Sequence, residues 1–282
     1  MDAVVGLNVD LHSHSTMSDG VLAPADVAGR AGVNGVQVWS LTDHDEVAGL
    51  PEAQKAAQEA GMQFVPGVEV SVTWARRTIH ILGLGIDFTE PELVAGLSGI
   101  RTRRVERAKE MAKRLDDAGV PDSYEGALPY ATNPSSISRT HFARFLVAKG
   151  YCKNMRMAFD KYLGDNKSAS VPLNWSTLEE VISWINGAGG RAVIAHPGRY
   201  GYSAIEFDAL FNQFKQMGGV AIEVITGSHF PNQYREYADV ARHYGFLASC
   251  GSDFHSPSES RVDLGALPRL PAGVKPVWHD WV

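Results

Sequence analysis

Short apolar runs along the 282-residue sequence are followed by histidine and carboxylate residues. These clusters are His12-Ser13-His14 with Asp19, Asp43-His44, Glu69 followed by His80, Ala195-His196-Pro197, and Asp253-Phe254-His255. Each run has the pattern of a β-strand, and polar groups at the carboxyl ends of parallel strands meet on one face of a sheet or barrel. The pattern therefore predicts an α/β fold that gathers these distant residues into one multinuclear metal site.

Strand and helix patterns alternate in two blocks. In the first block we expect strands over residues 7–11, 36–41, 63–68 and 79–84, with helices over 24–32 and 50–60. The second block begins with the pattern of a capping box, Ser176 and Glu179, for a helix to about residue 188, followed by strands over 192–195, 220–224 and 247–250. Seven strands in this order predict a closed or nearly closed barrel of parallel strands.

A helical segment separates the two blocks. Its arginine-rich stretch over residues 102–118 places Val105, Ala108, Met111 and Leu115 on a 3.6-residue period, and further helices are expected over 140–149 and 155–163. We therefore expect a barrel domain of residues 1–88 and 168–282 and a mainly helical insertion of residues 89–167. Such an insertion is typical of a cap that contacts substrate above a rigid, metal-bearing scaffold.

Composition limits the cellular compartment and the binding partners that we expect for the protein. Hydrophobic residues make up 44% of the chain, enough for a sizeable core, and the formal net charge of −6 gives no overall positive field to recruit duplex DNA. The first residues lack the basic and apolar regions of a secretory leader, and no apolar run reaches the roughly 18 residues of a membrane span. The only cysteines are Cys152 and Cys250. We expect a cytoplasmic protein with no membrane partner.

The spacing of the ligand candidates supports metal binding. His12 and His14 lie two residues apart, so both imidazoles project from the same side of a strand end, and Asp253 and His255 repeat this spacing. Glu69 offers a carboxylate that can bridge two cations.

Other histidines have two interpretations. His80 lies inside an apolar run, where a buried imidazole needs a partner, and we favour a metal ligand over a packed core histidine. For His196 we favour a ligand or an acid/base group. His141 either approaches the site from the cap or has a packing role. His229, His243 and His279 have no cluster around them, which favours packing or surface roles.

The motifs resemble those of the polymerase and histidinol phosphatase (PHP) family of metal-dependent phosphoesterases. The motifs that carry the resemblance are Asp10-Leu-His12-Ser-His14, Leu41-Thr-Asp43-His44-Asp45, Pro66-Gly-Val-Glu69, Ile79-His80, Ala195-His196-Pro197 and Gly251-Ser-Asp253-Phe-His255. The resemblance implies a distorted (β/α)7 barrel with two or three ions, most often manganese, with zinc or iron as alternatives. It also implies the ligand sets: His12, His14, Glu69 and Asp253 for one ion, Asp19, His44 and His255 for a second, and Glu69, His80 and His196 for a third.

The insertion narrows the resemblance to one branch of the family. The segment Asn133-Pro-Ser135-Ser-Ile-Ser138-Arg139-Thr-His141 is similar to a branch of the family that includes a 3′,5′-nucleoside bisphosphate phosphatase and an enzyme that trims short RNA from the 5′ end. Hydroxyl groups, a helix N-terminus and a guanidinium group suit a phosphate, so we predict that Asn133, Ser135, Arg139 and His141 contact substrate. The alternative is an ordinary helix cap with a surface arginine.

The leading hypothesis is a phosphohydrolase that removes the 3′-phosphate from a 3′,5′-bisphosphonucleoside. Alternatives are 5′-to-3′ exonuclease action on short RNA, a histidinol phosphate phosphatase, and a non-catalytic metal-binding module, whose hallmark would be lost ligands. Metal ions would polarise the phosphoryl group and lower the pKa of bound water, and His196 or Asp19 could protonate the leaving alkoxide.

The residues around the predicted ligands have supporting roles. We expect Asp43 and Asp45 to orient imidazoles and Glu223 to have a structural or orienting role. The arginine-rich face of the 101–114 segment is interpreted as solvent-exposed.

Overall fold

The computed structural model describes residues 6–172 and 175–282, and their strands form two sheets. The smaller sheet is parallel, in the order β1-β2-β3, and the larger has the order β6-β4-β5-β7-β8-β9. The strands are β1 (Val9–Asp10), β2 (Val38–Trp39), β3 (Gln63–Phe64), β4 (Gly67–Trp74), β5 (Arg77–Leu84), β6 (Ser176–Thr177), β7 (Arg191–Ile194), β8 (Ala221–Thr226) and β9 (Leu247–Gly251). The prediction of an α/β fold is therefore confirmed.

The larger sheet is mixed, so the prediction that the strands of a closed or nearly closed barrel are all parallel is wrong. Strand β5 is antiparallel to both β4 and β7. The reason lies in the turn between β4 and β5, where Ala75 and Arg76 have φ angles of 46° and 61°, as a two-residue hairpin turn requires. Isolated pairs, Ser13 with Phe254 and His44 with Glu69, and a few backbone hydrogen bonds join the two sheets, but the strands of the described residues form two separate sheets and no closed ring.

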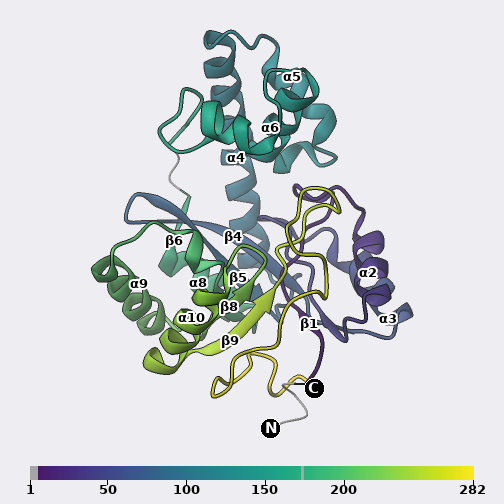
Figure 1. The fold of residues 1–282 in the computed structure, drawn as a ribbon, viewed down its shortest axis with the longest axis vertical. Helices are drawn as coiled ribbons and strands as arrows, with labels where there is room; N and C mark the ends of the chain where they lie inside the picture. Colours follow the sequence, from purple (N-terminus) through teal and green to yellow (C-terminus); the bar gives the residue numbers. More distant parts are fainter. Residues whose placement is uncertain (1–5, 173–174) are drawn as a thin grey trace.

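Helices cover the sheets on both sides. In Figure 1, α2 and α3 pack together beside the smaller sheet, and α9 and α10 lie on the opposite side of the molecule. The helices are α2 (Pro24–Val33), α3 (Leu50–Glu59), α4 (Pro91–Asp117), α5 (Ser123–Ala127), α6 (Arg139–Ala148), α7 (Met155–Ala158), α8 (Leu178–Gly187), α9 (Ala204–Gln216) and α10 (Pro231–Tyr244), with short turns η1 (Leu128–Tyr130), η2 (Pro134–Ser136), η3 (Phe159–Leu163) and η4 (Pro197–Arg199). No helix within residues 6–172 and 175–282 is long and apolar enough to cross a membrane.

Local signals explain two differences from the expected helices. The capping box of α8 is formed by Thr177 and Glu180, one residue later than expected, and both Ser176 and Thr177 pair with β4. Helix α4 begins at Pro91 rather than near residue 102, since the side chain of Glu90 accepts a hydrogen bond from the backbone N–H of Leu93.

Helix α4 connects two hydrophobic cores. Leu93 and Leu97, near its start, pack into the main core around the sheets, whereas Met111 and Leu115 pack into a second core with Phe142 and the other helices of the insertion. Figure 1 shows α4 rising from the sheets to the group that contains α5 and α6. The change of core therefore falls within α4, beyond the expected domain boundary near residue 89, and the division into two domains stays a prediction.

Candidate metal centre

The carboxylate of Glu69, on β4, lies at the centre of a histidine cluster. Its Oε1 is 2.8 Å from both His80 Nδ1 and His196 Nε2. The Glu69 side chain is completely buried. Burial alone would raise the pKa of Glu69, but the surrounding imidazoles, His44 foremost, hold it well below its usual range. Glu69 is therefore an anionic group whose two oxygens face different sets of rings.

The second oxygen of Glu69 faces the first strand end. Its Oε2 lies 3.3 Å from both His12 Nε2 and His14 Nε2, and these two nitrogens are 3.1 Å apart. Asp253 Oδ1 completes this group at 3.5 Å from His12 and 3.3 Å from His14. Burial disfavours the charged form of His14, but hydrogen bonds to Asp253 and Glu69 raise its pKa to about 10. Protons and metal ions compete for such nitrogens.

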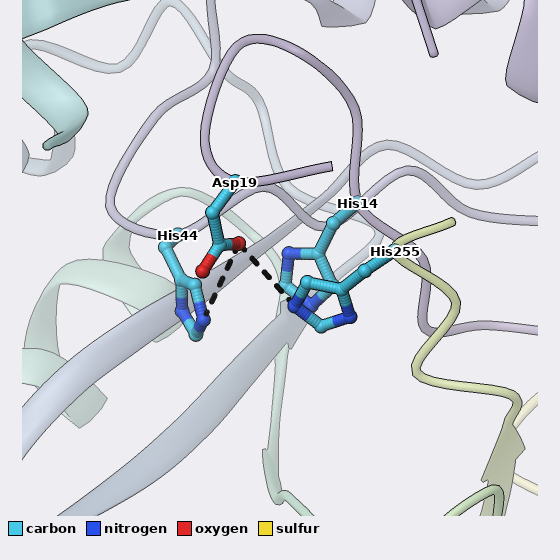
Figure 2. Close-up of side chains that lie close together, drawn as sticks. All are labelled: His14, Asp19, His44 and His255. Carbon is cyan, nitrogen blue, oxygen red and sulfur yellow. Dashed lines mark ion pairs between the residues drawn. The ribbon is translucent and has the colours of Figure 1, made fainter. Parts of the chain in front are cut away.

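A further group lies nearer to the insertion. Figure 2 shows the carboxylate of Asp19 between the ring of His44 and the rings of His14 and His255. Asp19 Oδ1 is 3.3 Å from His255 Nε2 and 4.0 Å from His44 Nε2. The other oxygen, Oδ2, accepts a hydrogen bond from the Ser138 hydroxyl at 3.2 Å. The insertion thus touches this group directly.

Several buried atoms of the cluster fit a bound metal. Asp19 Oδ1, Glu69 Oε2 and His44 Nδ1 are buried and form no hydrogen bond with any described residue, although His44 Nδ1 and Glu69 Oε2 lie 2.9 Å apart. Burial lowers the pKa of His44 to about 4, which leaves a neutral ring with a free lone pair. Burial, together with the charge of Arg199, lowers the pKa of His196 to about 3. Buried polar atoms normally have partners, so these convergent, unpaired nitrogens and oxygens suit divalent cations.

Glu223, on β8, supports two of these histidines. Its Oε1 accepts a hydrogen bond from His12 Nδ1 at 3.0 Å, and its Oε2 accepts one from the His196 backbone N–H at 2.6 Å. The side chains of Glu223 and His12 are both buried. A hydrogen bond to Nδ1 fixes the tautomer that leaves Nε2 free to bind a metal. This contact matches the orienting role considered for Glu223.

No hydrogen bond joins Asp43 or Asp45 directly to a described imidazole, but Asp43 reaches one through Ser18, whose hydroxyl lies 3.4 Å from His14 Nδ1. Asp43 accepts hydrogen bonds from the hydroxyls of Ser15 at 2.6 Å and Ser18 at 2.5 Å, so it fixes the loop between His14 and Asp19. Asp45 instead accepts from Arg104 Nε at 2.6 Å. Of Asp43, Asp45 and Glu223, Glu223 is the one that directly holds an imidazole.

The turn that carries His196 depends on His229. His196 has a φ angle of 28°, in the left-handed region, which is strained for a side chain of this kind. The backbone N–H of Gly198 donates to His229 Nε2 at 3.0 Å, while His229 Nδ1 lies 3.2 Å from the carbonyl of Val224. A Cβ at Gly198 would lie 2.7 Å from the His229 ring, so only glycine fits. His229 therefore has the expected packing role, and through it His229 supports this turn.

A cavity of about 130 Å³ lies between these groups and the insertion. His80 of β5 lines it, together with Asp19, His44 and His255 from the loops that follow strands. The arginines that line it are Arg104, Arg107, Arg139 and Arg199. Two of them come from α4, so the interpretation of its arginine-rich face as solvent-exposed is wrong for these residues.

Each of these arginines has a described contact that positions it at the cavity. Arg104 is only 6% exposed and donates to Asp45 and, at 2.8 Å, to Ser71. Arg199 donates to Asp253 Oδ2 at 3.1 Å. Arg139 pairs with Asp165 at 3.1 Å. Arg107 lies over the ring of Trp175.

Comparison with known proteins identifies the family. The PHP domain matches residues 10–111. A 3′,5′-nucleoside bisphosphate phosphatase from Chromobacterium violaceum is 47% identical, over 97% of this chain and 96% of that protein. The chain belongs to the PHP family. The 5′-3′ exoribonuclease Rnm of Salmonella typhimurium is 42% identical, over 96% of this chain and 93% of that protein. The structure of an amidohydrolase from Chromobacterium violaceum, with bound sulfate and no metal, has a TM-score of 0.94 and 47% identity, and covers 97% of this chain and 95% of that chain.

All of the metal ligands that the PHP resemblance implies lie within the cluster. They fall into four overlapping groups, each with ligand atoms within 4.8 Å of one another: His14, Asp19, His44 and His255; His12, His14 and Asp253; His12, Glu69 and His196; and His44, Glu69 and His80. The structure adds His14 to the second of the expected sets, leaves Glu69 out of the group that matches the first, and divides the third between a group with His12 and a group with His44. Their role as ligands stays a prediction.

Of the four residues predicted to contact substrate, one lines the cavity and three lie away from it. Arg139 lines the cavity, but Asn133, Ser135 and His141 are not among its lining residues. The Asn133 amide donates to the carbonyl of Met17 at 3.0 Å, and the Ser135 hydroxyl donates to Asn133 at 2.7 Å. These bonds give both residues a structural role in the turn before α6.

His141 belongs to the capping box of α6. Its Nδ1 accepts a hydrogen bond from the backbone N–H of Ser138 at 2.9 Å, and its side chain is completely buried. Burial lowers the pKa of His141 to about 4, so the ring is neutral at neutral pH. These contacts agree with the packing role considered for His141. The capping box positions Ser138, whose side chain lines the cavity.

Proposed function

We propose that this chain is a metal-dependent phosphoesterase that removes the 3′-phosphate from a 3′,5′-bisphosphonucleoside and releases a 5′-mononucleotide. The observation that carries the proposal is the convergence of nine potential ligands beside a cavity lined by arginines. Relatives that cover nearly the whole chain include a nucleoside bisphosphate phosphatase and an exoribonuclease, which supports a nucleotide substrate.

The nitrogen and oxygen donors would hold two or three divalent ions. Donor sets without thiolate suit Mn²⁺, Fe²⁺ and Zn²⁺, and we place Mn²⁺ first. When bound, such ions polarise the phosphoryl group and make water a stronger acid. In this proposal both oxygens of Glu69 would be available to hold metal ions, because they face different groups of imidazoles.

The arginines of the cavity would bind the phosphate groups. Arg199 lies beside the ligand Asp253 and is 51% exposed, so it can reach a phosphate at the metal centre. Arg139 and Arg107 project from the insertion and from α4, and Arg107 forms no ion pair with a described carboxylate. A cavity with more guanidinium groups than free carboxylates favours a substrate with two phosphates over one. On this basis we propose that residues 89–167 act as a substrate-binding cap.

The proton donor to the leaving group needs a separate assignment. The pKa of His196 is lowered to about 3 through burial and the charge of Arg199. Burial would raise the pKa of Asp19, but the charges of His255 and His44 hold it well below its usual range. Both groups are therefore deprotonated at neutral pH, which suits metal ligands better than proton donors. We propose them as ligands, and the proton-donor role given to them from the sequence stays a prediction.

Hydrolysis of short RNA is the second candidate, since the reacting unit is the same. A 3′,5′-bisphosphonucleoside and a 5′-phosphorylated RNA both begin with a nucleoside that carries a 5′-phosphate and a phosphorus on O3′. Water adds hydroxyl to that phosphorus and a proton to O3′, the O3′–P bond breaks, and a 5′-mononucleotide leaves in both cases. The substrates differ only in whether the phosphorus also carries a further nucleotide. The observation that favours this candidate is a larger groove next to the cavity.

A substrate panel tests the proposal. The metal-free protein is reconstituted with Mn²⁺ and assayed against a 3′,5′-bisphosphate, a 5′-mononucleotide, histidinol phosphate and a short 5′-phosphorylated RNA. We expect the highest kcat/KM for the 3′,5′-bisphosphate, and loss of activity with a chelator that Mn²⁺ restores. Inactivity on all four substrates, with metal bound, would contradict an enzymatic function and favour the non-catalytic module. A preference for histidinol phosphate would contradict the nucleotide substrate.

A further inference from the structure

The cavity at the metal centre opens into a larger groove. The two spaces share the lining residues Thr78, Arg107 and Arg199, and the groove has a volume of about 690 Å³. One wall is the β4–β5 hairpin, and another is the segment from Arg199 to Tyr202. We call this space the hairpin groove. A chain that leaves the metal centre past Arg199 enters it directly.

The lining of the hairpin groove combines cations with an aromatic ring. Arg76 and Arg77 are exposed at the tip of the hairpin, and Arg76 forms no hydrogen bond or ion pair with a described residue. The guanidinium of Arg77 lies 5.1 Å from the centre of the Tyr202 ring and donates to the carbonyl of Gly201 at 2.6 Å. Tyr202 is itself fixed edge-on against Trp74, with ring centres 5.1 Å apart.

These groups face a space with little negative charge. Asp165 is the one carboxylate among its lining residues, and it pairs with Arg139. Four arginines, Arg76, Arg77, Arg107 and Arg199, line the same groove. Positive charge beside an aromatic ring is the combination that binds single-stranded nucleic acid without reading its sequence. A metabolite with a single phosphate would not need cations spread along the whole groove.

We propose that the hairpin groove binds the nucleotide that follows the scissile phosphate in a short single-stranded RNA. This inference rests on the proposed function, because the first nucleotide and the scissile phosphate occupy the central cavity. There the ring of Phe159, on the cap side, is available to the first base. The next phosphate then lies near Arg77 and Arg76, and its base stacks in the region of Tyr202. The groove would thus decide how well RNA competes with the bisphosphate.

A double variant, Arg76→Ala with Arg77→Ala, tests the inference. Its control is Arg235→Ala with Arg269→Ala, which removes the same charge from exposed residues that line neither the central cavity nor the hairpin groove. Both variants and the wild type are loaded with Mn²⁺ and assayed on adenosine 3′,5′-bisphosphate and on 5′-phosphorylated di- and triadenylate, over a range of salt concentrations. Thermal unfolding of each variant checks that the hairpin is intact.

We expect a loss that is selective for RNA. In the double variant, kcat/KM for the triadenylate falls about tenfold, and the slope of log kcat/KM against log salt becomes shallower by about 0.7 for each lost phosphate contact. Activity on the bisphosphate changes less than about twofold, as does every activity of the control. A second variant, Tyr202→Leu, lowers kcat/KM for the RNA by at least about fivefold, through lost stacking.

The outcomes separate the two proposals. If the wild type hydrolyses neither the bisphosphate nor RNA, the proposed function itself is wrong. If the wild type is active but the double variant loses bisphosphate and RNA activity equally, the groove holds the first nucleoside, and the inference is overturned. Unchanged RNA kinetics and an unchanged salt slope also overturn it.

Discussion

Replacement of Glu223 by glutamine tests how the protein orients its candidate metal ligands. Glutamine has the same size, but its amide offers one acceptor oxygen where the carboxylate offers two. Both partners of Glu223 are donors: the His12 ring through Nδ1 at 3.0 Å, and the backbone N–H of His196 at 2.6 Å. In the variant, the amide nitrogen must therefore face one of these donors.

Either orientation of the amide weakens the site. If the nitrogen faces His12, the ring changes tautomer and Nε2 carries the proton, which lowers metal affinity about 10- to 100-fold, the usual effect of losing such a contact. If the nitrogen faces the backbone of His196, a buried N–H loses its acceptor at a cost of about 1–3 kcal/mol, in a turn that already has a φ angle of 28°.

Metal titration provides the assay. Metal-free wild type and Glu223→Gln are titrated with Mn²⁺ in a calorimeter, and thermal unfolding is followed with and without metal. The control is Glu236→Gln, on the exposed side of α10, where the same change of charge touches no predicted ligand. We expect weaker Mn²⁺ binding and a smaller metal-induced rise in Tm for Glu223→Gln alone. Equal affinity and stoichiometry in both variants would refute the role of Glu223 in orienting His12.

Three further predictions concern the surroundings of the site. Asp45→Asn leaves Arg104 buried without its partner, so the free energy of unfolding should fall by about 3–5 kcal/mol in urea, against about 0–1 kcal/mol for Asp239→Asn at an exposed pair. Burial lowers the pKa of His229 from 6.5 to about 4, so the unfolded state binds its proton first as the pH falls. The free energy of unfolding of the wild type, measured in urea, should therefore drop between pH 6.5 and 4. His229→Gln has no titrating ring at this position, so its free energy of unfolding should drop less over the same pH range. Equal drops in the two proteins would exclude His229 as the source. Arg139→Ala should raise KM for the bisphosphate about tenfold with unchanged metal content, whereas Arg156→Ala, at a pair far more exposed, should leave KM unchanged.

Several of the candidate metal ligands could be predicted because they lie just after a strand, although Glu69 and His80 lie within β4 and β5. His12 and His14 follow β1, and His196 follows β7, so local sequence alone places them at strand ends. Convergence of those ends is a general property of α/β folds, and it needs no knowledge of long-range contacts. The direction of β5 did not matter for His80, because the antiparallel strand still brings its side chain to Glu69 at 2.8 Å.

The direction of the strands could not be predicted in the same way. The hairpin turn uses Ala75 and Arg76 in a left-handed conformation, where the usual signal would be asparagine or glycine. Pro66 also divides the run over residues 63–68 between two strands, β3 and β4, that belong to different sheets. Tertiary pairing overrides local preference here, so the sequence pattern alone favoured a parallel barrel.

The inward-facing arginines did leave a signal in the sequence. Arg104 precedes Ala108, Met111 and Leu115 by four, seven and eleven residues, so it occupies the apolar stripe of α4 rather than its polar face. A charged residue at such a position requires a buried partner. That partner, Asp45, is 59 residues away, and no local pattern identifies it.

The contact between Arg104 and Asp45 determines how the insertion is attached to the metal centre. Helix α4 has 27 residues, about 40 Å of continuous helix, and its first half is embedded in the main core. Arg104 ties the middle of this helix to the residue next to His44, and Ser138 ties the insertion to Asp19. A helix held at several points transmits position better than a flexible linker. Differences in substrate preference among relatives of this chain should therefore arise from the side chains that line the cavity and the hairpin groove, rather than from movement of the insertion.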